Sequence, residues 1–415
     1  MNLLTNMRSH SDYWLYFFSI LLSLVGIDLF VYTQGWYVLQ LTGDNLSVGF
    51  SWSIFFTPSL LFLPIMGKML DSPNVKKVLM GFEFAKAAIL LLFIPLLYLL
   101  PNVHLVYLMS ALFGIFFATF YPSIYVVLKK VAPSEATAKY SHLFELSIQI
   151  ASVLAMALAG LLYNALGFLT LAGMGGILLI CSGLLISKIK IKSLDDSNSF
   201  RLLQEYRNFI SLVRTVFSRK DNSNKRLYLF GVFHQFPQNI VLAVNIPILL
   251  YVYQVMQKGP MEYGILDGVA GFAALLTGLF WTRFYKSGQS RWLMLCMPLL
   301  TAFSFVLIAI IHPVSIVPYL AFFLMSAFLT SSKIQCRAAV LLATPAEVMG
   351  KLTTFYQTIS YAVMIILAFS TSYLCHTMSI SRVFVVFAIL MAAFTFFLLL
   401  IYEPEPQAIL EQVTS

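Results

Sequence analysis

The chain has 415 residues, of which 60% are hydrophobic and only 10% are charged, and its mean hydropathy is +0.86. Soluble domains usually carry about 25% charged residues, so most of this surface cannot face water. The composition excludes an ordinary soluble protein and predicts an all-α protein embedded in the bilayer, because a helix satisfies its backbone hydrogen bonds within each membrane segment.

Twelve apolar stretches are long enough to cross a bilayer, which takes about 20 residues of helix. Short polar breaks separate them, and the first stretch is too long for the core of a secretory signal. The membrane-spanning helices that we predict are Tyr13–Leu41, Leu46–Leu70, Val75–Leu100, Leu105–Leu128, Thr137–Leu162, Gly167–Ile189, Leu227–Val255, Tyr263–Tyr285, Trp292–Ile311, Ile316–Leu342, Val348–Cys375 and Ile380–Tyr402.

The 26 lysines and arginines are distributed unevenly over the breaks between these spans. If the N-terminus is cytoplasmic, most of them lie on the cytoplasmic side, and only Lys258 and Arg382 lie outside. Because such a bias marks the cytoplasmic face, we expect a multi-pass protein of the bacterial inner membrane with both termini in the cytoplasm. Anionic lipid headgroups then account for the net charge of +9, and no nucleic-acid partner is expected.

The longest polar break divides the chain into three parts. We expect an N-terminal six-helix bundle in residues 1–189, a cytoplasmic linker in 190–226 and a C-terminal six-helix bundle in 227–415. In the linker, apolar residues recur at helical spacing over residues 200–217, which predicts an amphipathic helix on the inner membrane surface. A solvated linker is the alternative interpretation of this segment.

A short internal repeat indicates that the two bundles are pseudo-symmetric. The sequence Leu-Met-Ser-Ala occurs at 108–111 in the fourth span and again at 324–327 in the tenth. Parallel repeats of this kind are common in transporters.

A family motif follows the second span, with the spacing Pro-x5-Pro-x2-Gly-x3-Asp and two lysines shortly after it. The motif is formed by Pro58, Pro64, Gly67, Asp71, Lys76 and Lys77. The glycine permits close helix approach, and the aspartate can attract the N-terminus of a facing helix. This pattern resembles the drug-and-siderophore exporter branch of the major facilitator superfamily.

The resemblance implies twelve helices in two bundles, a cavity lined by the first, fourth, seventh and tenth spans, and a conformational switch at Gly67, Asp71, Lys76 and Lys77. The sequence departs from the family pattern at Ser72, where arginine is usual, and at Asn74, where glycine is usual. The antiporter glycine-proline motif is also absent, because no proline accompanies Gly160 in the fifth span.

Ionisable residues inside the spans are the candidate functional groups, because charge is costly in lipid. Asp28 lies near the middle of the first span, and Tyr32 and Gln34, which we assign to substrate binding, follow it closely in sequence. Burial disfavours the charged form of a carboxyl, so Asp28 is predicted to exchange protons near neutral pH. A structural hydrogen bond to a neighbouring helix is the alternative.

Lys333 and Arg337 lie four residues apart in the tenth span and so share one helix face. Lys333 needs an anion, which is either Glu145 of the fifth span, a second candidate for proton coupling, or a carboxylate-rich substrate. Arg337 lies close to the cytoplasmic end, where extending its charge to the interface is an alternative to substrate binding.

Three further polar residues mark the seventh span as a candidate cavity wall. His234, Gln238 and Asn239 flank Pro237, which breaks the helix hydrogen bonds there. We assign them to substrate binding, with a buried, hydrogen-bonded histidine as the alternative for His234.

Three other charged residues within the spans receive structural interpretations. Glu83 and Lys86, three residues apart in the third span, are expected to neutralise each other. Asp267 is expected nearer the outer surface, as a gate or a cap.

No enzyme signature accompanies these residues. The sequence has no Walker loop, nucleophile elbow, zinc spacing or Rossmann fingerprint, so we expect no enzymatic activity, cofactor or metal. With the resemblance, the pattern favours a monomeric, proton-driven exporter of a small anionic or amphipathic metabolite, with a carboxylate siderophore as the leading substrate. A multidrug pump of the same fold, a siderophore or nutrient importer, and a sensor or scaffold without transport are the alternatives.

Overall fold

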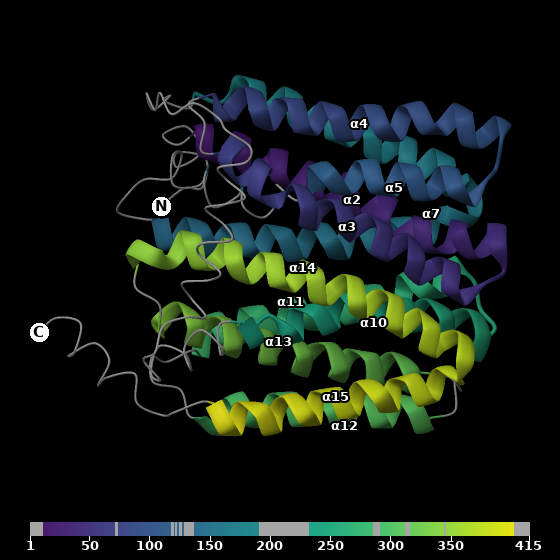
Figure 1. Cartoon of the computed structure of the whole chain (residues 1–415), viewed down its shortest axis with the longest axis vertical. Helices are drawn as coiled ribbons and strands as arrows, with labels where there is room; N and C mark the ends of the chain where they lie inside the picture. The colour runs from purple at the N-terminus through teal and green to yellow at the C-terminus, as the bar shows by residue number, and fades with distance from the viewer. Residues whose placement is uncertain are drawn as a thin grey trace, which may run out of the picture.

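The computed structural model describes residues 11–70, 74–117, 120, 123, 127, 137–190, 232–284, 291–311, 316–343 and 346–401. Within these ranges every regular element is a helix (Figure 1). The elements are α2 (Ser11–Thr42), α3 (Asn45–Leu70), α4 (Val75–Leu99), α5 (Val103–Phe117), α7 (Thr137–Lys188), α10 (Phe236–Leu250), η2 (Tyr251–Val255), α11 (Pro260–Phe284), α12 (Arg291–Ile310), α13 (Val317–Ala343), α14 (Ala346–Thr377) and α15 (Ile380–Ile401).

These helices match the predicted spans, with α7 covering the fifth and sixth spans and α10 together with η2 forming the seventh. Helix α7 consists of two helices that meet at Gly167, where φ is 73° and ψ is 171°. A residue without Cβ adopts this backbone conformation at little cost. Nine helices within the described ranges are long and apolar enough to cross a membrane. Counting α7 as two helices and adding α3 and the shorter α5 gives the twelve that the sequence predicts.

The helices form two groups that follow the order of the chain. Helices α2, α3, α4, α5 and α7 pack together, and so do α10 to α15. We call these the N-terminal and C-terminal halves; they are the upper and lower groups in Figure 1. The main contacts between the halves are those of α3 with α14 and of α7 with α11, and α10 adds smaller contacts with α2 and α3. The linker boundaries and its amphipathic helix at 200–217 lie outside the described residues and stay predictions.

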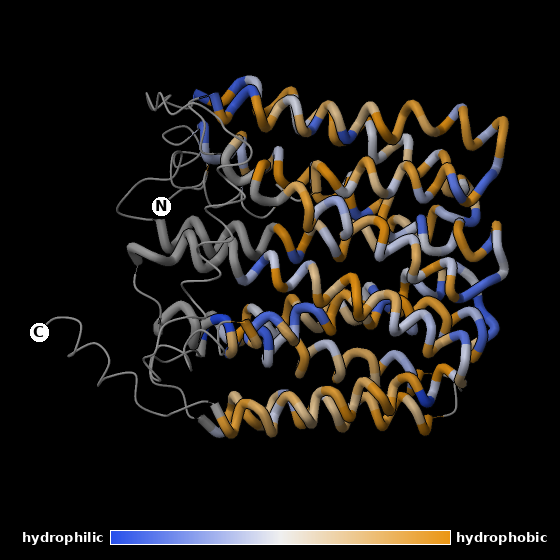
Figure 2. The backbone as a smooth tube through the Cα atoms, viewed as in Figure 1, coloured by the Kyte–Doolittle hydropathy of each residue, from blue (hydrophilic) through white to orange (hydrophobic). Residues whose placement is uncertain are grey.

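Four of the described turns lie at the same end of the bundle (Figure 1). We call the end that carries the turns at 43–44, 100–102, 256–259 and 378–379 the outer end, after the charge-based orientation. Figure 2 shows polar residues at these turns, on the right, and hydrophobic residues along the helices between. This distribution is that of a bundle whose middle lies in hydrocarbon and whose ends reach water.

Glycines bring α7 and α11 close together across the two halves. A Cβ on Gly160 would collide with the Gly264 backbone, and a Cβ on Gly264 would collide with Gly160 in turn. Small residues of this kind let membrane helices approach closely, and van der Waals packing then holds them together. The contact places α11 of the C-terminal half directly against the N-terminal half.

This contact predicts that Gly160→Ala destabilises the protein by about 1–3 kcal/mol, because the added methyl forces the two backbones apart. Thermal unfolding of the purified protein measures the loss. Gly268→Ala, on the same helix α11, is the control, because its added methyl meets nothing within 4 Å. Equal melting temperatures for both variants would contradict the interpretation.

Candidate functional site

Asp28 lies in α2 at the contact between the two halves. Its Oδ2 accepts a 2.7 Å hydrogen bond from Ser152 Oγ of α7, and its side chain is half-buried. Helix α7 also packs on α11, so the element that orients Asp28 is one of those that join the halves. The hydrogen bond to a neighbouring helix, considered from the sequence as the structural alternative, is therefore present.

A second carboxyl, from the C-terminal half, interacts electrostatically with Asp28. It belongs to Asp267 of α11, which is 6% exposed and whose Oδ2 has no hydrogen-bond partner. Sequence reasoning treated Asp267 as a gate or cap near the surface and did not pair it with Asp28. The available signal was that each aspartate lies within an otherwise apolar span.

Two stacked tyrosines cover these carboxyls toward the outer end. Tyr32 lies one turn beyond Asp28 in α2, and Tyr263 lies one turn before Asp267 in α11, in both cases on the outward side. Their ring centroids are 4.4 Å apart at an interplanar angle of 11°. The ring of Trp36, a further turn out, lies 6.1 Å from that of Tyr263. Tyr32 is buried, with 7% of its surface exposed, and its hydroxyl has no hydrogen-bond partner.

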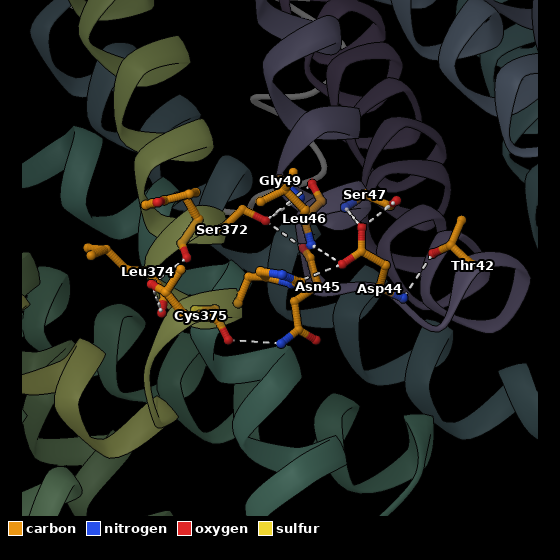
Figure 3. Close-up of polar contacts among 12 residues, drawn as sticks. Thr42, Asp44, Asn45, Leu46, Ser47, Gly49, Ser372, Leu374 and Cys375 are labelled. Carbon is orange, nitrogen blue, oxygen red and sulfur yellow. Dashed lines mark hydrogen bonds and ion pairs between the residues drawn. The ribbon is translucent and has the colours of Figure 1, made fainter.

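At the outer end, polar contacts join the start of α3 to the end of α14 (Figure 3). Asn45 Nδ2 donates to the Cys375 carbonyl at 2.9 Å, and Ser372 Oγ donates to the Asn45 carbonyl. The Gly49 amide donates to Ser372 Oγ at 3.1 Å. These bonds come from opposite halves, so the two halves are closed together at this end.

Asp44 contributes a charge to the same outer contact. Its carboxylate accepts hydrogen bonds from the amides of Leu46 and Ser47, as an N-cap of α3, and lies 3.3 Å from His376 Nδ1. Partial burial acts to raise the pKa of Asp44, but the hydrogen bonds and His376 outweigh it and hold the pKa below its ordinary value of 3.8. The carboxylate is therefore charged at neutral pH.

The other predicted binding residues of α2 and α10 lie in helix contacts within each half. Gln34 is 1% exposed and accepts a 2.9 Å hydrogen bond from Ser110 of α5. Asn239 accepts a 2.6 Å hydrogen bond from Ser360 of α14. His234 is buried with its ring edge-on to another aromatic ring at 5.4 Å, and Gln238 is half-buried. Substrate contact by these residues stays a prediction.

The charged candidates near the predicted cytoplasmic end are described only in part. Lys333 is half-buried and Arg337 is exposed on α13. The side chain of Glu145 lies outside the described residues, so its pairing with Lys333 is not tested. Of the switch motif, Lys76 is half-buried and Lys77 exposed in the first turn of α4, whereas Asp71 and the surroundings of Gly67 are not described.

Glu83 and Lys86 form the ion pair that their spacing predicts. Lys86 Nζ lies 2.8 Å from Glu83 Oε1, and the lysine is 2% exposed. Ser23 of α2 donates to the same Glu83 oxygen at 3.1 Å and accepts from Lys86 at 3.2 Å. The pair therefore ties α4 to α2 inside the N-terminal half.

A cavity of about 1010 Å³ opens on the N-terminal half between α2, α4 and α7. Tyr37, Gln40 and Tyr163 line it, and none of the predicted site residues is among its described lining. Another cavity, of about 310 Å³, lies beside the close contact of α7 and α11. In the described part of the chain, no three His, Cys, Asp or Glu residues gather to hold a metal.

The buried ion pair predicts that Lys86→Met lowers the unfolding free energy by about 3–5 kcal/mol, because it leaves Glu83 buried without a counter-charge. The double variant Glu83→Gln/Lys86→Met removes both charges and should recover most of the loss. Denaturant unfolding of the two purified variants measures this. A double variant as unstable as the single one would show that the charges themselves are not the cause.

The outer contact predicts that Asp44→Ala costs about 1 kcal/mol at neutral pH through the lost N-cap. Because the pKa of Asp44 is lowered in the folded protein, its contribution is complete above the ordinary value of 3.8 and disappears as the pH falls below it. The stability difference from the parent should therefore shrink at pH 3. A His376→Gln background removes the other titrating partner, and a difference that grows at acid pH would contradict the assignment.

Comparison with known proteins identifies the family. The family model described as the Major Facilitator Superfamily matches residues 16–233, more than half of the chain. No curated protein sequence matches significantly.

Solved structures of transporters resemble nearly the whole chain. The nucleoside transporter NupG is 12% identical with a TM-score of 0.68, covering 94% of this chain and 100% of its own. The human organic anion transporter TETRAN is 14% identical with a TM-score of 0.68, covering 93% and 98%. A bacterial homologue of the human lysosomal transporter Spinster is 13% identical with a TM-score of 0.65, covering 95% and 97%. At these identities the likeness shows the fold alone.

The family match and this fold agree with the helices described above, which form twelve spans in two pseudo-symmetric halves. The chain belongs to the major facilitator superfamily and is a membrane transporter.

Proposed function

We propose that this protein is a proton-coupled secondary transporter that exports a small anionic or amphipathic metabolite by alternating access. The observation that carries the proposal is the position of Asp28, a carboxyl in the middle of a membrane span that is hydrogen-bonded to Ser152 at the contact between the halves. A titratable group within a span marks an ion or proton pathway by default. At this contact, its charge state also acts on the movement of one half against the other.

The closed outer end suggests the order of events. With the halves joined at Asn45 and Ser372, the conformation described here is closed to the outside. An external proton reaches Asp28 once that end opens, and an inward proton gradient then drives the return while the metabolite leaves. Asp28 is the proton acceptor in this scheme; the chain supplies no site for ATP.

The proposed substrate is an anion because α13 presents two cations one turn apart. Lys333 and Arg337 share a helix face, and a carboxylate-rich ligand such as a carboxylate siderophore complements both. The resemblance of the motif from Pro58 to Asp71 to siderophore exporters supports this class. The structurally similar TETRAN carries organic anions, which shows that the fold accommodates such a ligand.

The proposed setting follows from the charge distribution. We propose that the chain lies in the inner membrane of a bacterial cell with both termini in the cytoplasm, which the distribution of the basic segments supports. We propose that it acts as a monomer, since each half already covers the other and the central site needs no second copy.

The proposal predicts that Asp28→Asn abolishes export driven by a pH gradient, because an amide occupies the same space but cannot carry the proton. The assay is transport of a citrate-based siderophore into inverted proteoliposomes with and without the gradient. Glu262→Gln is the matched control, a carboxyl of α11 that pairs at 3.9 Å with Lys258 at the outer end. Full gradient-driven transport by Asp28→Asn would refute the coupling role.

Separate experiments test the identity of the substrate and the direction of transport. Efflux of several unrelated lipophilic cations from intact cells, without movement of the siderophore, would favour the multidrug pump. Accumulation of the siderophore in cells that express the protein would favour an importer. Genes for siderophore synthesis beside this one would support the proposed substrate.

A further inference from the structure

We infer that Asp28 and Asp267 form one proton site shared by the two halves, and that the proton held there keeps the outer end closed. The inference rests on the proposed function, because it assigns to that same site a second residue and a conformational effect. It differs in predicting a measurable opening that requires no transported substrate.

The two carboxyls come from opposite halves of the protein. Asp28 belongs to α2 and Asp267 to α11, and α7 packs on both helices. Asp28 already receives the hydrogen bond of Ser152, whereas Asp267 Oδ2 is buried without any partner. A buried carboxylate oxygen without a donor is costly, which favours the protonated form of this carboxyl.

Repulsion between the two carboxylates links their protonation to the contact between the halves. Two ionised carboxylates in a site of low dielectric repel strongly, and a pair of this kind retains a proton. Because each carboxyl is attached to a different half, the repulsion acts between the halves rather than inside one of them. Loss of the shared proton therefore favours their separation at the outer end, and its return favours closure.

No described cation takes the place of the proton between the two carboxyls. The ionisable groups nearest the pair are Tyr32 and Tyr263, which are neutral phenols under ordinary conditions. Helix α7 contributes Ser152, and α10 has no ionisable residue between 236 and 250. Helix α13 has none between Tyr319 and Lys333.

The remaining charges near α2 are already paired. Glu83 and Lys86 of α4 meet α2 at Ser23 and neutralise each other. They lie more than one turn inward of Asp28, so they do not supply a counter-charge to it.

The surroundings of the two carboxyls favour a proton over a larger cation. The stacked rings of Tyr32 and Tyr263 close the pair toward the outer end, and neither cavity has Asp28 or Asp267 in its described lining. The hydroxyl of Tyr32 is buried, unpartnered and in electrostatic contact with Asp267. An organic cation would have to part the rings, whereas a proton needs no added space.

The experiment measures opening at the outer end in the full chain, reconstituted in lipid nanodiscs without substrate. Spin labels at Asn102→Cys in the N-terminal half and Ser379→Cys in the C-terminal half, both exposed, report the distance between halves by pulsed electron resonance. The four native cysteines are replaced by alanine. His376→Gln is included throughout, so that the contact with Asp44 does not contribute to the pH response.

In this background, the ratio of closed to open molecules should fall by up to about tenfold for each unit by which the pH rises, because the shared proton leaves. The double variant Asp28→Asn/Asp267→Asn should stay closed at every pH, because two amides carry no charge. Asp267→Asn alone should also flatten the response and serves if the double variant does not fold. Glu262→Gln, on the same helix as Asp267, should keep the full response.

A distance distribution that does not change with pH, or a response that survives in the double variant, would overturn the inference. Closure that follows sodium at constant pH would overturn it in favour of a sodium site. If the distances do not respond but Asp28→Asn still loses gradient-driven export, the shared site is wrong and the proposed function stands. If the distances respond as expected but no gradient drives transport, the proposed function is wrong and the shared site stands.

Discussion

The contact of α2 and α11 with α7 is the constraint on which the rest of this structure depends. Glycines at 160 and 264 let α7 and α11 approach until their backbones touch, and Ser152 of α7 holds the carboxyl of Asp28. A polar group in lipid must find its partner within the protein. The same contact therefore supplies the van der Waals packing between the halves and the polar environment of the candidate site.

The contacts between the halves differ in kind from those inside the N-terminal half. Toward the outer end, stacked aromatic rings and hydrogen bonds to Asn45 and Ser372 close the halves against each other. Each such bond contributes modestly, roughly 0.5–1.5 kcal/mol, so a few of them can form and break during a transport cycle. The paired charges of Glu83 and Lys86, by contrast, lie wholly inside the N-terminal half and suit a rigid body that moves as a unit.

The candidate site could be predicted only in part. A carboxyl in the first span is visible in the sequence, because charge in an apolar stretch is rare and costly. Its neighbours were less accessible to sequence reasoning. Tyr32 and Gln34 are both predicted to bind substrate; in the structure Tyr32 stacks on Tyr263 of the other half, whereas Gln34 hydrogen-bonds Ser110 within the N-terminal half. Two positions apart on one helix, the side chains have partners in different halves, which the sequence does not indicate.

The sequence by itself determined the twelve helices, their approximate ends and the pairing of Glu83 with Lys86. Hydrophobic length and helical spacing are local properties, and lipid leaves the backbone no alternative to a helix. Only the tertiary structure decided that Asp267 meets Asp28, since 239 residues separate them and no local pattern encodes which faces of α2 and α11 turn toward each other. Small residues on α7 and α11 settle that choice, because they allow an approach that larger side chains would block.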